Sequence, residues 1–78
     1  MAYKYVTVVA DNSGDEKTIA SIFEDSGFKI NKMDYDIDIT DNEKKYIFTV
    51  SSKDGVSMQE VIDAVTNLKF AKKLEIRS

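Results

Sequence analysis

The clearest pattern in the chain is a strict alternation of apolar and acidic residues over Met33–Ile39. A repeat of two is typical of a half-buried β-strand, because successive side chains of a strand point to opposite faces. One face carries Asp34, Asp36 and Asp38, which we expect to meet water. The other face carries the apolar side chains that we expect to lie under helices: Met33, Tyr35, Ile37 and Ile39.

Tyr3–Ala10 predicts a strand that is apolar on both of its faces. Tyrosine, valine and threonine, which are enriched in strands, dominate this segment. A strand that is apolar on both sides usually lies in the centre of a sheet. Its two sides are Val6, Val8 and Ala10 on one, and Tyr5, Thr7 and Val9 on the other.

Two segments have the spacing of amphipathic helices, one at about 15–26 and one starting near Ser57. Each is preceded by a serine followed three residues later by a glutamate, which is the capping-box pattern. Gly27 predicts the end of the first helix, because glycine adopts the left-handed backbone that stops a helix. The capping pairs are Ser13 with Glu16 and Ser57 with Glu60. The stripes are Ile19, Ala20, Ile22, Phe23 and Ser26, and Met58, Val61, Ile62, Val65 and Leu68.

The remaining strands are predicted at Lys29–Ile39, Lys45–Ser52 and Ala71–Arg77, with a hairpin loop over 40–44. The order is therefore β-α-β-β-α-β in one domain that spans residues 1–78. With right-handed crossovers, this order predicts an α+β, ferredoxin-like βαββαβ sandwich. We expect a four-stranded antiparallel sheet of order 4-1-3-2 with two helices on one face. The other face of the sheet is then left open.

Composition narrows the range of functions. The chain has no cysteine and no histidine, which removes thiolate metal sites and the commonest general base. We therefore expect no enzyme activity, no bound metal and no cofactor. A net charge of −3 disfavours nucleic-acid binding, because phosphate contacts dominate that affinity. The apolar runs are too short to span a bilayer, so we expect no membrane insertion of this segment.

The three aspartates of the alternating strand allow two interpretations, a metal or acid-base site and a solvated strand face. Side chains on one face of a strand are about 7 Å apart, and in water their repulsion is only about 0.6 kcal/mol per pair. Mg²⁺ needs oxygen ligands at about 2.1 Å, which side chains at that spacing do not offer without movement. We favour the solvated face.

The loop Asp11, Asn12, Ser13 and Gly14 precedes a helix N-terminus, which is a ready site for an anion such as a ligand carboxylate. The competing interpretation is a helix capped by its own side chains, with Asp15 and Glu16 repelling anions. We favour the self-capped helix, because a capping box is the commoner use of this pattern, and keep the four loop residues as a candidate ligand site.

A second candidate site is the open face of the sheet. We expect Tyr5, Thr7, Val9, Ile47 and Thr49 to form an apolar strip across the two central strands. A contiguous exposed apolar strip indicates a contact with a partner, here a homodimer or another domain. RNA binding by Tyr46 and Phe48 is disfavoured, because both would have to leave the core.

The pattern resembles the ACT-like regulatory domains over nearly the whole chain. The resembling residues are the strand that ends in Asp11-Asn12-Ser13-Gly14, the helix after it, and Ser26–Ile30 leading into the next strand. The resemblance implies a regulatory domain that is not an enzyme. Amino-acid-binding ACT domains usually carry a Pro-Gly pair in the loop, and here Ser13 stands at the proline position.

The second half is most similar to one branch, the C-terminal cytosolic domain of the MgtC/SapB membrane proteins. The resembling residues are Asp63–Leu68 followed by Lys73–Ile76. This resemblance implies an excised C-terminal, cytoplasmic regulatory domain of a magnesium-transport-associated membrane protein. The alternative is an ACT domain that senses a small molecule, such as an amino acid, at Asp11–Gly14.

Overall fold

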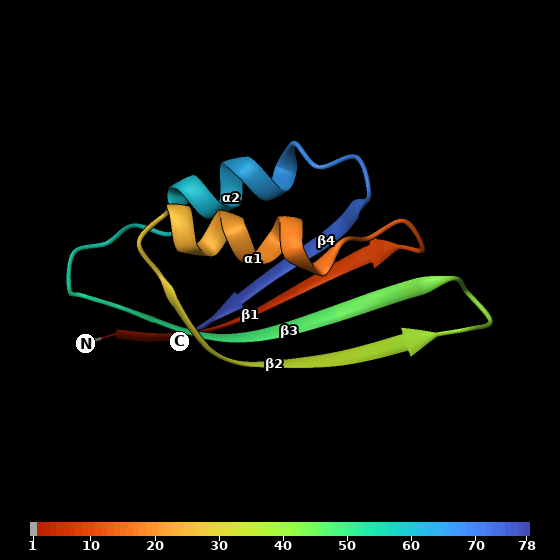
Figure 1. The fold of residues 1–78 in the computed structure, drawn as a ribbon, viewed down its shortest axis with the longest axis horizontal. Helices are drawn as coiled ribbons and strands as arrows, with labels where there is room; N and C mark the ends of the chain where they lie inside the picture. Colours follow the sequence, from red (N-terminus) through yellow and green to blue (C-terminus); the bar gives the residue numbers. More distant parts are fainter. Residues whose placement is uncertain (1) are drawn as a thin grey trace.

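The structure is a computed structural model and describes residues 2–78. Four strands and two helices follow one another in the predicted order, and Figure 1 shows both helices on one face of the sheet. The predicted α+β class is confirmed. The elements are β1 (Ala2–Asp11), α1 (Glu16–Asp25), β2 (Lys29–Asp38), β3 (Glu43–Ser52), α2 (Gln59–Thr66) and β4 (Ala71–Arg77).

The sheet has the strand order β2-β3-β1-β4, and all neighbouring strands are antiparallel. Counted from the β4 edge, this is the order 4-1-3-2. The arrangement is compatible with a ferredoxin-like fold. It places β1 and β3 in the centre and leaves β2 and β4 as the two edges of the sheet.

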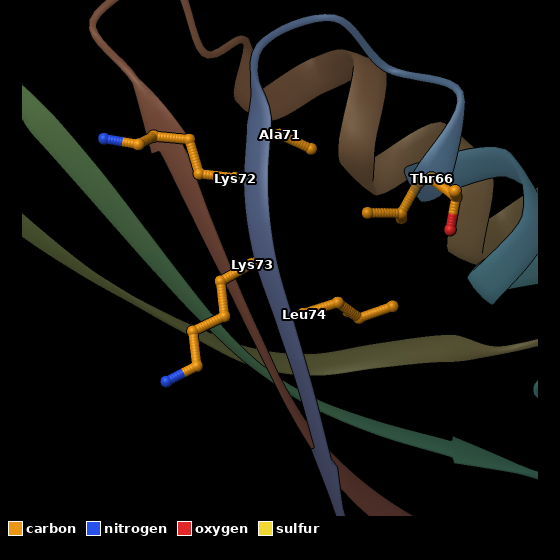
Figure 2. Close-up of a pocket in the computed structure, with 6 residues that line it drawn as sticks. Thr66, Ala71, Lys72, Lys73 and Leu74 are labelled. Carbon is orange, nitrogen blue, oxygen red and sulfur yellow. The ribbon is translucent and has the colours of Figure 1, made fainter.

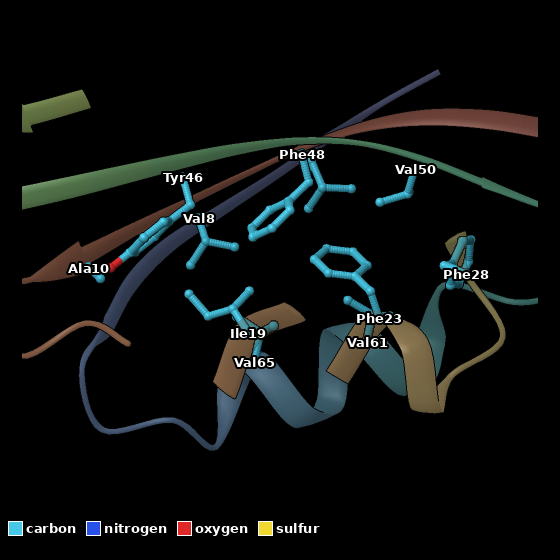
Figure 3. Packing of buried hydrophobic residues seen from close by; sticks show 11 residues of the cluster. Val8, Ala10, Ile19, Phe23, Phe28, Tyr46, Phe48, Val50, Val61 and Val65 are labelled. Carbon is cyan, nitrogen blue, oxygen red and sulfur yellow. The ribbon is translucent and has the colours of Figure 1, made fainter. Parts of the chain in front are cut away.

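The core lies between the central strands and the two helices (Figure 3). Phe23 of α1 is at its centre, with ring centroids 4.9 Å from Phe48 and 6.4 Å from Phe28. Aromatic pairs at these separations stabilise a core beyond the area that they bury. The buried apolar residues are Val6, Val8, Ala10, Ile19, Phe23, Phe28, Tyr46, Phe48, Val50, Val61 and Val65.

The start of α1 differs from the prediction. Asp15, not Ser13, is the N-cap: its Oδ1 accepts a hydrogen bond from the Lys17 N–H at 3.2 Å, and the Thr18 hydroxyl donates to Oδ2 at 2.8 Å. Ser13 is turned back to Asp11, to which its N–H and its hydroxyl both donate. The predicted capping box at Ser13 is therefore wrong, because Asp11 offers that serine a closer acceptor.

The end of α1 is as predicted. Gly27 has a φ of +92°, and its N–H donates to the Glu24 carbonyl at 3.2 Å. The Phe28 N–H donates to the Phe23 carbonyl at 3.0 Å, which completes a Schellman motif. The same two residues form the edge-to-face aromatic pair of the core, so the backbone cap and the side-chain packing position Phe28 together.

The second helix begins at Gln59, where the Ser57 hydroxyl accepts a hydrogen bond from the Gln59 N–H at 3.0 Å. Met58 occupies the N-cap position, whereas the capping box of Ser57 and Glu60 predicts Ser57 there, one residue earlier. The predicted stripe is confirmed for Val61 and Val65, which are fully buried, and for Met58 and Leu68, which pack against the core. Ile62 is half-buried.

Strand β2 has the predicted alternation, and Met33 lies opposite Phe48 on the helix side of the sheet. Tyr35 and Ile37 are nevertheless 48% and 51% exposed. Figure 1 shows the reason: the β2–β3 hairpin extends beyond the N-terminal end of α1, so the two helices do not reach over its outer part. Our expectation that helices cover the whole apolar row is correct for Met33 and wrong for the residues after it.

Candidate functional site

The open face of the sheet brings together the five residues predicted to form an apolar strip. Tyr5 lies directly opposite Thr49, and Thr7 lies opposite Ile47. Val9 continues the strip along β1, and all five lie on the side away from the helices. Tyr5 is 45% exposed. The strip is therefore a single patch across the two central strands.

Tyr3 extends this strip, although the sequence interpretation left it out. It lies two residues before Tyr5 on the same face of β1, opposite Ser51, and is 53% exposed. The period of two along a strand was sufficient to include it. With Tyr3, the strip carries two exposed tyrosines side by side along β1.

Charged residues border the strip on both edge strands. On β2, Asp34 lies opposite Ile47 and forms an ion pair with Lys32 at 3.7 Å. On β4, Lys73 and Glu75 form an ion pair at 3.4 Å, next to Val9 and Thr7 of β1. An apolar centre with a polar rim is the usual composition of a protein–protein contact.

The three aspartates of β2 lie on this open face, as predicted. Asp36 and Asp38 line a shallow cavity of about 100 Å³ together with Glu43 and Lys45. Asp38 accepts a hydrogen bond from the Asp41 N–H at 3.1 Å. Within residues 2–78, no group of three or more acidic, histidine or cysteine side chains is arranged to hold a metal ion. The solvated-face interpretation thus fits the geometry.

The predicted ligand loop connects β1 to α1, and its four residues, Asp11 to Gly14, do lie together. The Asp11 carboxylate accepts hydrogen bonds from the Ser13 hydroxyl at 2.6 Å and from the Ser13 N–H at 2.8 Å. These bonds, with Lys72 and Lys44 nearby, lower the pKa of Asp11. The Gly14 N–H donates to the Asp11 carbonyl at 3.0 Å. Several groups that an anion would use are therefore engaged within the loop.

Gly14 is required by close packing. A Cβ at this position would lie 2.8 Å from the Ala10 Cβ and 3.2 Å from the Tyr46 hydroxyl oxygen. The Lys44 ammonium donates to the Gly14 carbonyl at 3.2 Å and fixes the loop against β3. Burial, together with a hydrogen bond to Tyr35, raises the pKa of Tyr46 to about 12. The loop is thus a packed part of the structure, and its use as a ligand site stays a prediction.

A second cavity, of about 200 Å³, lies between α2 and the edge strand β4 (Figure 2). In Figure 2, Ala71 and Leu74 point toward α2, while Lys72 and Lys73 point away from it. The register between β1 and β4 shifts just after Val9, which places Lys72 in an irregular step of the strand. The sequence interpretation missed this cavity, because a one-residue shift of register leaves no pattern in the sequence. The cavity is lined by Val65, Thr66, Ala71, Lys72, Lys73 and Leu74.

Neither helix among residues 2–78 is long and apolar enough to cross a membrane. No protein-family model and no curated protein matches the chain.

Proposed function

We propose that this domain is a non-enzymatic interaction module that associates with a second copy of itself through the open face of its sheet. The observation that carries the proposal is the apolar strip of Tyr5, Thr7, Val9, Ile47 and Thr49 on the central strands. Among residues 2–78, two helices cover the opposite face of these strands, and no helix covers this one.

The physical argument is the cost of apolar surface in water. Burying apolar area stabilises a contact by about 25 cal/mol per Å², and contiguous exposed patches are uncommon on monomers. The charged side chains stand at the rim of the strip, where they stay hydrated when two faces meet. A second copy is the partner of matching chemistry, because both faces then present the same apolar centre.

The resemblance to ACT-like domains supplies the role for such a module, which is regulation within a larger assembly. The branch it suggests is the cytosolic domain of a magnesium-transport-associated MgtC-type membrane protein, which would place this segment in the cytoplasm. This part of the proposal rests on the resemblance alone. A genomic reading frame with a run of hydrophobic helices upstream would support it, and a frame without one would contradict it.

Sedimentation over a wide range of protein concentration tests the face contact. At high salt, where contacts between exposed charges are screened, we expect the chain to form dimers at high micromolar concentration, and the double variant Tyr5→Ser/Ile47→Ser to stay monomeric. The matched control is Tyr35→Ser/Ile37→Ser, which changes the same residue types on the other side of the sheet, where Tyr35 is about as exposed as Tyr5 and Ile37 is more exposed than Ile47. A strict monomer, or equal loss of dimer in both variants, would contradict the proposal.

The predicted ligand loop has a separate test. Thermal-shift measurements against amino acids and nucleotides would detect a ligand at Asp11–Gly14, since binding at 100 times the dissociation constant adds about 2.7 kcal/mol of stability. A shift that Gly14→Ala or Ser13→Ala removes would support ligand sensing. Absence of any shift would remove this alternative.

A further inference from the structure

The two edge strands of the sheet both present an unpaired outer edge. Within residues 2–78, neither Lys29–Asp38 nor Lys72–Arg77 makes a backbone hydrogen bond outside the sheet. An unpaired edge is a template for another strand, and proteins usually protect it with charges. The charges on these two edges show which strand each would accept.

On the open face, the two edges carry opposite net charges. β2 has two lysines and three aspartates there, which leaves −1, and β4 has a lysine and an arginine against one glutamate, which leaves +1. Lys72 is not counted, because its charge is paired with Glu43 of β3. Two β2 edges or two β4 edges would therefore repel each other. A β2 edge and a β4 edge attract. The residues are Lys29, Lys32, Asp34, Asp36 and Asp38 on β2, and Lys73, Glu75 and Arg77 on β4.

The helix side of the two edges is complementary as well. β2 presents Tyr35 and Ile37, about half exposed, and the β2–β3 hairpin extends beyond the N-terminal end of α1. β4 borders the cavity of about 200 Å³ whose wall includes Ala71, Leu74 and Val65 of α2. This volume is smaller than a typical small-molecule site and suits a side chain. Only a β2 edge beside a β4 edge brings these side chains to the cavity.

We propose that the β4 edge binds strand β2 of a second copy as an added antiparallel strand. The strand directions permit antiparallel pairing, because within one copy β2 runs parallel to β1 whereas β4 runs antiparallel to it. A second copy that continues the sheet with its helices on the same side therefore presents β2 antiparallel to β4. The aspartates then meet Lys73 on the open side, and Tyr35 meets the cavity on the helix side.

One register satisfies the charges in detail. With Asp34 opposite Lys73, antiparallel pairing places Lys32 opposite Glu75 and Met33 opposite Leu74. The ion pairs within each strand, Lys32–Asp34 and Lys73–Glu75, then form a square in which each charge has two neighbours of opposite sign. Cross-strand pairs of opposite charge stabilise a sheet. The same register places Tyr35 opposite Lys72, next to Ala71 at the mouth of the cavity.

This contact joins different surfaces on the two copies, so it continues from copy to copy and does not stop at a dimer. The face contact under Proposed function joins the same surface on both copies and does stop at two. The edge contact also depends on charge and should weaken with salt, since screening acts on exposed pairs. The two proposals therefore stand or fall separately.

Charge exchange tests the edge contact. The variants are Asp34→Lys/Asp36→Lys and Lys73→Glu/Arg77→Glu, all at exposed positions, and circular dichroism would verify their folding. For the unchanged chain we expect assemblies larger than a dimer at low salt. For each variant alone, the apparent association constant for growth beyond the dimer should fall about tenfold or more, because its two edges then carry charge of the same sign. An equimolar mixture should restore it, because each variant complements the other.

Tyr35→Ser/Ile37→Ser should also stop growth beyond the dimer, while Tyr5→Ser/Ile47→Ser should leave edge-to-edge growth in place. The proposal is overturned if the unchanged chain never exceeds a dimer at low salt. It is overturned as well if the mixed charge variants do not restore growth, or if the β4 variant alone associates normally, which would indicate pairing of β2 with β2.

Discussion

The side chains on the two sides of β1 differ in size as well as in burial. Toward the helices the strand carries Val6, Val8 and Ala10, which are small and fully buried. Away from them it carries Tyr3 and Tyr5, each about half exposed. The small residues leave room for the large side chains that β3 and the helices supply, Tyr46, Phe48 and Phe23. On the open face, the part of the chain that the structure describes has no second layer to fill the space beside the tyrosines.

The difference shows that apolarity alone does not decide which side of a sheet becomes the core. Both sides of β1 are apolar enough to be buried, but only one side has the close approach of a loop and two helices. The contact of Gly14 with Ala10 and Tyr46 requires small residues on that side. The other side keeps its large side chains for a partner to cover.

The largest expected effect contrasts a core residue with a residue of the strip. Phe23→Ala removes the ring that contacts Phe48 and Phe28, and should lower the free energy of unfolding by about 3–5 kcal/mol. That is a large part of the about 4–12 kcal/mol that a domain of this length has in total. Urea unfolding measures it.

The control is Ile47→Ala on the open face, measured at a concentration where the chain is monomeric. We expect a loss of about 1 kcal/mol or less, because Ile47 is only half-buried there. Equal losses for the two variants would mean that the open face is as tightly packed as the core.

The second contrast adds volume in place of removing it. Gly14→Ala places a methyl group 2.8 Å from the Ala10 Cβ, and overpacking of this kind costs about 1–3 kcal/mol. Thr7→Val changes the shape of a strip residue very little and exchanges a hydroxyl for a methyl group. We expect it to alter the free energy of unfolding by less than about 0.5 kcal/mol. Thermal unfolding of both variants measures the difference.

The sequence was sufficient for the element order, the helix stripes and the faces of the strands, because each depends on a local period of two or 3.6 residues. Gly27 was predictable for a similar reason, since few residues adopt its φ of +92°. The five residues of the strip were predicted to share a face only because they occupy every second position of their strands. Their adjacency followed from placing both strands at the centre of the sheet.

What the sequence did not show depends on distances between elements. Asp15 caps α1 because Asp11 already holds Ser13, which is a competition between two neighbouring carboxylates. The alternation in β2 predicts a face but not how far the helices reach, so the exposure of Tyr35 and Ile37 was missed. The register shift near Lys72 and the cavity beside it leave no trace in a residue pattern.

The third prediction concerns the buried hydroxyl of Tyr46, whose pKa is raised to about 12 in the folded chain. An unfolded tyrosine loses its proton near pH 10. Between these values the unfolded state has released the proton and the folded state has kept it, so stability falls as the pH rises. The slope reaches at most about 1.4 kcal/mol per pH unit.

Tyr46→Phe removes this titration, so the loss of stability from pH 10 to 12 should become shallower than in the unchanged chain. Urea unfolding at pH 9, 10 and 11 compares the two slopes. Tyr5→Phe on the open face is the matched control. Tyr5→Phe should leave the fall of the unfolding free energy with pH unchanged. If it flattened this fall as much as Tyr46→Phe does, the hydroxyls of the covered and the open face would not differ.

The smallest expected effect lies at the loop that joins the two sides. The Ser13 hydrogen bonds lower the pKa of Asp11 in the folded chain below its ordinary value of 3.8. The ionised carboxylate therefore stabilises the fold above about pH 4, and this contribution is lost as the pH falls below the ordinary value. Asp11→Asn should lower the melting temperature slightly at pH 7 and leave it nearly unchanged at pH 2.

Ser13→Ala should act in the same way, and the double variant should lose less than the sum of both, because the two residues form one interaction. Losses that add fully would show that Asp11 is stabilised by Lys72 and Lys44 and not by the serine.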